Sequence, residues 1–121
     1  MTEIFPGAAG HRPLGAPPSG TRHVDAGTLA WQPSGTEGFL YKPLFEDPAS
    51  AVRTWLMRIE PGASAPMHAH TEAEQIYVLA GTFYDQNGVY TPGDYLVRAP
   101  GAEHTAGSED GATVLLIYSR A

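Results

Sequence analysis

Residues 62–74 read GASAPMHAHTEAE, and this segment contains two histidines followed closely by two glutamates. In an extended strand, alternate side chains point to the same face of the sheet, so His68, His70 and Glu74 would share one face. Ile76, Val78 and Ala80 continue the same parity. The segment therefore predicts two imidazoles and one carboxylate that face an apolar interior.

A metal ion is the most economical explanation for such a group. Burying imidazoles and a carboxylate in an apolar interior is costly unless they are paired or bind a cation. A further ligand is expected from His104, because turn residues at 92–93 and 100–101 bracket a strand whose end would return the chain to the same interior. Nitrogen and oxygen ligands together suit Fe(II), Mn(II), Zn(II), Ni(II) or Cu(II). We therefore expect one divalent metal ion, and its predicted ligands are His68, His70, Glu74 and His104.

The rest of the chain predicts strands rather than helices. Short apolar runs alternate with turn residues after residue 23, at spacings typical of antiparallel all-β domains. Asn87-Gly88 predicts a hairpin closed by a two-residue type I′ turn, which needs positive φ at both central residues. No segment of useful length combines helical periodicity with capping residues. The predicted strands cover residues 39–44, 52–59, 75–79, 82–85, 89–91, 95–99 and 113–118.

The length of 121 residues suits one domain. Residues 1–23 are rich in proline and glycine and contain almost no apolar run, a composition that cannot form a core. We interpret them as either a disordered tail or an arm that lies along a neighbouring surface. The folded domain is expected to cover residues 24–121.

The charge and the N-terminal segment exclude some classes of partner. Thirteen acidic against seven basic residues give a net charge of −6, which disfavours nucleic acid in the absence of a basic patch. The first ten residues lack the basic and apolar regions of a signal peptide, and no run is long enough to span a membrane. The chain has no cysteine. We expect a cytoplasmic protein whose partners are small molecules or copies of itself.

The ligand segment resembles a known motif. Gly62, His68-x-His70, Glu74 and Gly81 are spaced as in the first cupin motif. The segment from Gly93 to His104 resembles the second motif, with a proline directly before the glycine at 101 and a spacing one residue longer. This resemblance implies an all-β fold with a single-domain double-stranded β-helix, the jelly-roll or cupin barrel.

A closer resemblance extends over most of the chain. Residues 74–83, EQIYVLAGTF, and residues 88–95, GVYTPGDY, are similar to the cupin domain of zinc anti-sigma factors. They also resemble acetylacetone-cleaving and dihydroxyacetophenone-cleaving dioxygenases. The resemblance implies a metal-dependent enzyme, a non-haem Fe(II) dioxygenase cleaving a small diketone, hydroxyketone or phenolic ketone. It implies as an alternative a metal-bound cupin that senses or binds a ligand without turnover. Cupin-like barrels commonly pair sheet against sheet, which implies a homodimer.

Three charged residues have open roles at this stage. Glu74 is expected either to remain a metal ligand or to detach and act as a base. Arg58 and Arg98 each lie in an apolar predicted strand. Period-two alternation leaves their faces undecided near a turn, so each is either an outward surface charge or an inward anchor for a substrate oxyanion.

Overall fold

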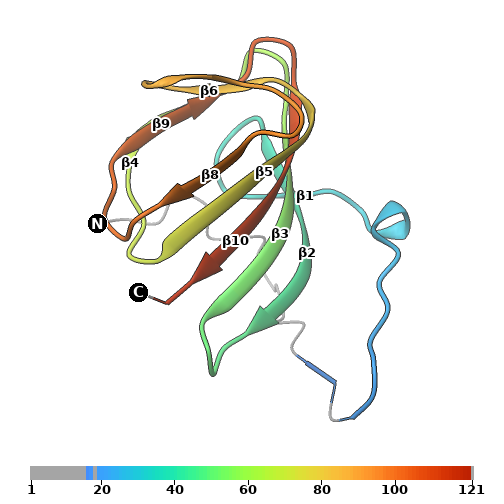
Figure 1. The fold of residues 1–121 in the computed structure, drawn as a ribbon. Helices are drawn as coiled ribbons and strands as arrows, with labels where there is room; N and C mark the ends of the chain where they lie inside the picture. Colours follow the sequence, from blue (N-terminus) through green and yellow to red (C-terminus); the bar gives the residue numbers. More distant parts are fainter. Residues whose placement is uncertain (1–15, 18, 121) are drawn as a thin grey trace.

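The structure is a computed structural model that describes residues 16–17 and 19–120. It is almost entirely β, with one short 3₁₀ turn, η1 (Ala26–Thr28). The strands alternate with short turns along the chain (Figure 1). Their bounds are β1 (Gln32–Pro33), β2 (Phe39–Asp47), β3 (Val52–Ile59), β4 (Ser64–His68), β5 (Ala73–Gly81), β6 (Phe83–Asp85), β7 (Gly88–Tyr90), β8 (Tyr95–Arg98), β9 (His104–Gly107) and β10 (Ala112–Ser119).

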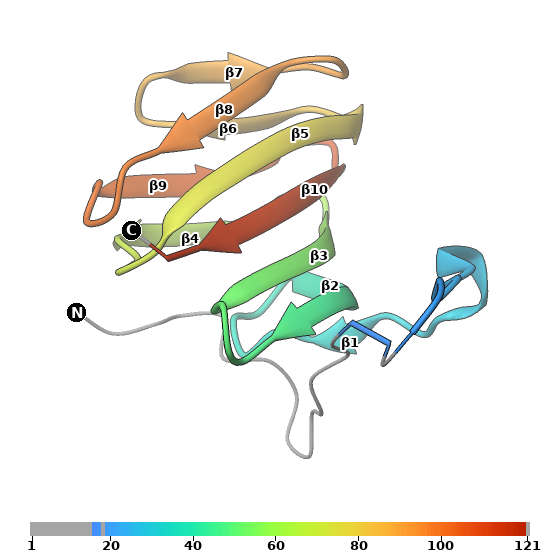
Figure 2. The ribbon, with the colours of Figure 1, turned by 60° about the horizontal axis from the view of Figure 1, so that its bottom comes forward.

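Two antiparallel sheets face each other and form the jelly roll that the sequence predicts. The larger sheet has six strands in the order β1-β2-β3-β10-β5-β8, and the smaller has four in the order β4-β9-β6-β7. Figure 2 shows the smaller sheet lying behind the larger one. Non-consecutive strands are neighbours in both sheets, as when β10 lies between β3 and β5. The predicted all-β fold with jelly-roll topology is therefore confirmed.

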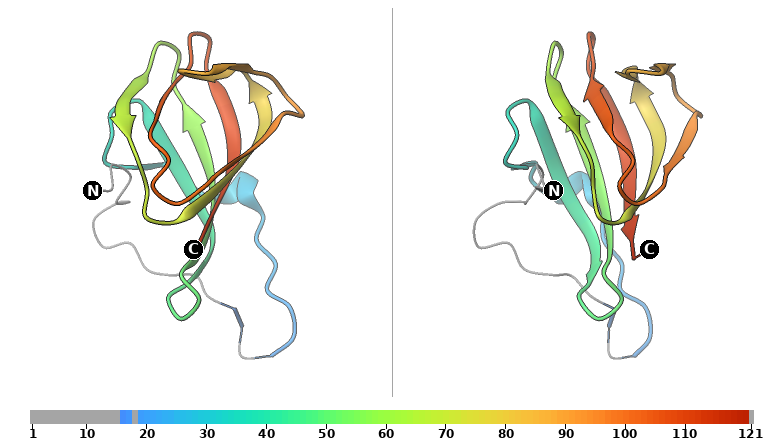
Figure 3. Two further views of the ribbon diagram at one scale, coloured as in Figure 1. Left: turned by 60° about the vertical axis from the view of Figure 1, so that its left-hand side comes forward. Right: turned by 90° about the vertical axis from the view of Figure 1, so that its left-hand side faces the viewer.

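The inward-facing residues of the larger sheet form most of the core. Strand β10 alternates between buried and half-buried residues along its whole length, as expected when one face packs on an interior. Trp55 is fully buried, with its ring centroid 4.4 Å from Tyr41 and 6.0 Å from Tyr118. These large aromatic side chains stabilise the end of the barrel nearest the β2–β3 hairpin, which extends beyond the other strands in Figure 3.

Gly81 shows why the motif ends in glycine. Its φ is +71°, and a Cβ at this position would overlap the backbone of Gly111 and Ala112. The close approach occurs at the end of β5, near the register shift at Thr113 and Val114 of β10. The shift also ends the inward parity of β5, because Val78 is buried whereas Ala80 is exposed. The expectation that Ala80 faces the interior is therefore wrong.

All seven predicted strands are present, with ends that differ by a few residues. Strands β1, β4 and β9 were not among them. Pro66 in β4 and Gly107 in β9 have low β-propensity, and a register shift interrupts the pairing of these two strands. Local sequence therefore gives a weak strand signal there, and tertiary pairing determines the outcome.

The hairpin at Asn87-Gly88 forms, but its turn is not type I′. Asp85 pairs with Gly88, so Gln86 and Asn87 are the loop residues, and neither they nor Gly88 has positive φ. Asp85 Oδ1 instead accepts hydrogen bonds from the backbone N–H groups of Asn87 at 2.8 Å and Gly88 at 3.2 Å. Hydrogen bonds to the aspartate side chain thus stabilise this turn, whereas we expected positive φ at Asn87 and Gly88 to do so.

The segment before β1 lies against the larger sheet. The Arg22 guanidinium donates to Leu44 O at 2.7 Å, and Lys42 Nζ donates to Ala26 O at 2.8 Å. Lys42 Nζ also lies 4.5 Å from the centroid of the Trp31 ring. Most of the predicted arm, residues 1–15 and 18, lies outside the described residues, so the choice between tail and arm stays open. No helix in the part of the chain described is long and apolar enough to cross a membrane.

Candidate metal centre

Three buried histidines meet between the two sheets. His68 ends β4, His104 begins β9, and the two residues are cross-strand partners. His70 lies in the connection from β4 to β5. One ligand nitrogen from each of the three lies within 4.8 Å of the others. The structure therefore brings together three predicted ligands in a cluster that could bind one metal ion.

The imidazoles of His68 and His104 are oriented by backbone carbonyls. His68 Nδ1 lies 2.7 Å from Pro66 O, and His104 Nδ1 lies 3.2 Å from Ala102 O. A neutral imidazole that donates from Nδ1 leaves its Nε2 lone pair for a metal. Burial, assisted by the Arg98 charge, lowers the pKa of His104 to about 3. His104 is therefore neutral at pH 7, and the donor set fits a transition metal ion.

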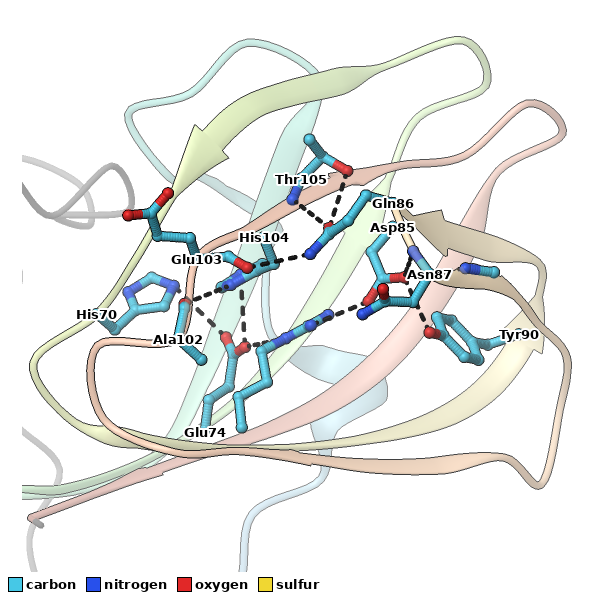
Figure 4. Close-up of polar contacts among 12 residues, drawn as sticks. His70, Glu74, Asp85, Gln86, Asn87, Tyr90, Ala102, Glu103, His104 and Thr105 are labelled. Carbon is cyan, nitrogen blue, oxygen red and sulfur yellow. Dashed lines mark hydrogen bonds and ion pairs between the residues drawn. The ribbon is translucent and has the colours of Figure 1, made fainter.

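Glu74 lies beside this cluster but is shared with an arginine. Its Oε2 is 3.6 Å from His70 Nε2, and its Oε1 is 3.7 Å from His104 Nε2. Oε1 also accepts a hydrogen bond from Arg98 Nε at 3.1 Å. Figure 4 shows the Glu74 carboxylate directed towards His70 and His104. Glu74 is thus within reach of the histidines while it is engaged in an ion pair.

His68, His70 and Glu74 lie close together, but not because they alternate along one strand as the sequence predicted. Parity assumes one extended segment, but β4 ends at His68 and the chain turns at residues 69–72 before β5 begins. His68 and Glu74 consequently lie on opposite sheets, and both line the cavity between them. The closure of the barrel brings the residues together.

The two arginines have different surroundings. Arg98 is buried at the end of β8, where it is the cross-strand partner of Glu74. Among the described residues, its Nη2 is a buried nitrogen without a hydrogen-bond partner. The Arg58 side chain is 47% exposed and forms a 3.4 Å ion pair with Glu60. The structure therefore places only Arg98 at the cavity, because Arg58 lies on the outward-facing parity of β3.

Asp85 is a member of the site that the sequence prediction omitted. Its Oδ2 accepts a 2.9 Å hydrogen bond from Arg98 Nη1, and its Oδ1 accepts a 2.8 Å bond from the Tyr90 hydroxyl. Burial opposes the ionisation of Asp85, but hydrogen bonds from Asn87 N–H, Tyr90 and Arg98 outweigh burial and lower its pKa. A signal existed in the sequence, since Phe83 and Asp85 share the inward parity of a short strand.

The cavity next to the histidines is small and mostly apolar. Its volume is about 30 Å³, room for roughly two water molecules. The wall consists of polar residues from the site and of apolar side chains from both sheets, including Phe39, Ile76 and Leu116. The space suffices for an ion and a small ligand. Pockets for organic ligands are about ten times larger.

An all-β jelly roll with a buried histidine cluster of this kind defines a cupin. The family model for the ChrR cupin-like domain matches residues 19–120, and the chain belongs to this family. None of the curated proteins compared matches the sequence.

Solved cupin structures share the fold. A protein of unknown function from Ralstonia eutropha is 28% identical with a TM-score of 0.62, and the match covers 69% of this chain and 56% of that one. The structure of SigE from Rhodobacter sphaeroides in complex with the anti-sigma factor ChrR gives 23% sequence identity and a TM-score of 0.63. This match covers 76% of this chain and 50% of that one. An acetylacetone dioxygenase from Acinetobacter johnsonii is 13% identical with a TM-score of 0.70, and the match covers 90% of this chain and 79% of that one. This chain thus spans about half the length of the first two.

Proposed function

We propose that the chain binds one divalent metal ion through His68, His70 and His104, with Glu74 as a further ligand. The observation that supports the proposal is the buried cluster of three imidazoles, whose ligand atoms lie within 4.8 Å of one another. We favour Fe(II), with Zn(II) or another transition metal as the alternative, since imidazole suits several of these ions. When bound, Fe(II) would supply open coordination positions for dioxygen and an oxygen-containing substrate.

We propose further that the loaded protein is a dioxygenase that cleaves a small diketone, hydroxyketone or phenolic ketone. The similarity to acetylacetone dioxygenase and the apolar wall of the cavity support this activity. Two side chains have roles in it. The Glu74 carboxylate, if it leaves the metal, accepts a proton from the substrate carbon next to the carbonyl. Arg98 Nη2 donates a hydrogen bond to a substrate oxygen.

A second candidate function is a metal-bound cupin that senses or binds a ligand without turnover. The cavity volume favours this candidate, because about 30 Å³ does not accommodate a substrate of several carbon atoms. Membership in the ChrR cupin-like family also supports it. The dioxygenase requires the barrel to open near the histidines, whereas binding of a water-sized ligand does not.

Oxygen uptake distinguishes the two candidate functions. Protein loaded anaerobically with Fe(II) is expected to consume dioxygen with at least one member of a panel of 1,3-diketones, hydroxyketones and phenolic ketones. Glu74→Gln is expected to lower the rate by about 100-fold or more, since loss of a general base typically costs 10²–10⁴-fold. Absence of uptake with every compound, in protein that binds metal tightly, would contradict the dioxygenase and favour the second candidate.

We also propose that the protein forms a homodimer through the outer face of the larger sheet. Strand β8 lies at one edge of this sheet, and Tyr77 of β5 pairs with Tyr95 of β8. Tyr77, Leu79, Tyr95 and Val97 are 43–65% exposed and form a patch without charges. Two copies can therefore bury the same patch against each other across a two-fold axis, despite the net charge of −6.

Light scattering after size exclusion tests the dimer. The protein is expected at twice the chain mass, and Tyr95→Glu at the chain mass, because a buried unpaired carboxylate opposes association. Val89→Glu is the matched control, since Val89 is 68% exposed on β7 of the other sheet. A monomer at micromolar concentration, or equal masses for the two variants, would count against this interface.

A further inference from the structure

We propose that Asp85 is a positioning residue for the metal centre and acts through Arg98 on Glu74. The inference rests on the metal site proposed above and adds a residue that neither the cupin motif nor the histidine cluster contains. Asp85 lies at the end of β6, in the smaller sheet, whereas Glu74 and Arg98 are cross-strand partners in the larger sheet. One guanidinium thus connects the two sheets at the site.

The hydrogen bonds form a continuous chain. Arg98 Nε donates to Glu74 Oε1 at 3.1 Å, and Nη1 of the same guanidinium donates to Asp85 Oδ2 at 2.9 Å. The guanidinium is planar, so its orientation at one carboxylate determines its orientation at the other. All three side chains are at most 9% exposed, which limits screening by water. The position of Asp85 is therefore transmitted to the Glu74 carboxylate.

The surroundings of Asp85 hold it in place. Its Oδ1 accepts hydrogen bonds from two backbone N–H groups of the β6–β7 turn and from the Tyr90 hydroxyl (Figure 4). Three donors on one oxygen fix the carboxylate, which leaves Oδ2 directed at Arg98. Asp85 consequently draws the guanidinium towards β6, and Glu74 then contacts Arg98 only through Nε among the contacts that the structure shows.

The charges give Asp85 a second effect on the site. Glu74 and Asp85 supply two carboxylates against the one guanidinium of Arg98, so the buried triad has an excess of negative charge beside the three histidines. A divalent cation is attracted by that charge. Without the charge of Asp85, the charges of Arg98 and Glu74 would cancel, and the site would lose its net attraction for a cation. The guanidinium would also be free to bind Glu74 with two nitrogens, which would compete with the metal for that carboxylate.

Asp85→Asn tests this inference by titration with zinc against a competing chelator. Asparagine can keep its single side-chain oxygen as the acceptor for the β6–β7 turn, and it then directs an uncharged NH2 group towards Arg98. We expect zinc affinity to fall about 10- to 100-fold, the usual effect of changing a residue that supports a metal ligand. The matched control is Asp94→Asn, which makes the same charge change at an exposed aspartate that accepts from Thr91 N–H.

The Co(II) form provides a readout that general loss of stability does not affect. Its visible absorption bands report the number and type of ligands, and they are expected to change in Asp85→Asn but not in Asp94→Asn. Should Asp85→Asn not fold, as judged by circular dichroism, Tyr90→Phe removes one hydrogen bond from Oδ1 and is expected to give a smaller loss of affinity in the same direction.

The outcomes separate this inference from the metal site itself. If the wild-type protein binds zinc and Asp85→Asn matches Asp94→Asn in affinity and in spectrum, the role of Asp85 is wrong while the metal site stands. The same holds if Asp85→Asn does not fold and Tyr90→Phe matches the wild-type protein. If the wild-type protein binds neither zinc nor Co(II), the proposed site and the role of Asp85 are both wrong.

Discussion

His104→Ala and His68→Ala are each expected to reduce metal affinity by more than about 100-fold, because even residues that only support a ligand contribute about 10- to 100-fold. These two imidazoles are cross-strand partners with ring centroids 4.2 Å apart, so neither can be replaced by a neighbour without a change of register. Carbonyl groups at Pro66 and Ala102 already orient them. When one histidine is replaced by alanine, the remaining imidazole should therefore stay in its orientation and not take over the lost metal contact.

Elemental analysis of the purified variants, followed by titration with zinc, measures this effect. His23→Ala is the control, because His23 is exposed in the segment before η1. Circular dichroism shows whether each variant retains the β fold. Metal content equal to that of the wild-type protein in both His68→Ala and His104→Ala would place the metal elsewhere in the chain.

Arg98→Met is expected to destabilise the metal-free protein by about 3–5 kcal/mol, the cost of removing one partner from a buried ion pair. This loss is large against the total of about 5–15 kcal/mol for a small domain. The Glu74 and Asp85 side chains are 4% and 0% exposed, and both contact Arg98 in the wild-type protein. The variant therefore leaves two buried carboxylates without their common cation.

Urea unfolding with a chelator present measures the destabilisation. The same experiment with zinc at about 100 times its Kd should recover roughly 2.7 kcal/mol by mass action if the variant still binds the ion. Arg58→Met is the matched control, with an expected change within about 0.5 kcal/mol because its ion pair with Glu60 is exposed. Equal stability of the two variants would show that Arg98 is not required to balance the buried carboxylates.

Local patterns predicted the strands and the segment that contains His68 and His70, whereas the convergence of the three histidines depends on closure of the barrel. Alternation and turn residues indicated all seven predicted strands, and the spacing of Gly62, His68, His70 and Glu74 indicated the ligand segment. The strands β4 and β9 were missed because their pairing with each other, rather than local propensity, makes them extended.

The parts of the site that sequence did not predict depend on long-range contacts. Alternation within β8 could not establish which way Arg98 points, since a shift by one residue reverses every side chain of a strand. Arg98 is directed inward by two carboxylates, one in its own sheet and one in the other. Asp85 was predicted only as the last residue of a strand, and its contact with Arg98 spans 13 residues and two sheets.

The two cross-strand pairs at the site, His68 with His104 and Glu74 with Arg98, belong to opposite sheets. An ion bound by His68, His104 and Glu74 would cross-link the sheets, so that its release and the parting of the sheets become one event. The dissociation rate of the metal would then be set by the rate at which the two sheets separate locally, rather than by the strength of any one metal–ligand bond. Amide hydrogens in β4 and β9 should accordingly exchange more slowly in the metal-loaded protein, whereas those of the β2–β3 hairpin should exchange at the same rate in both forms.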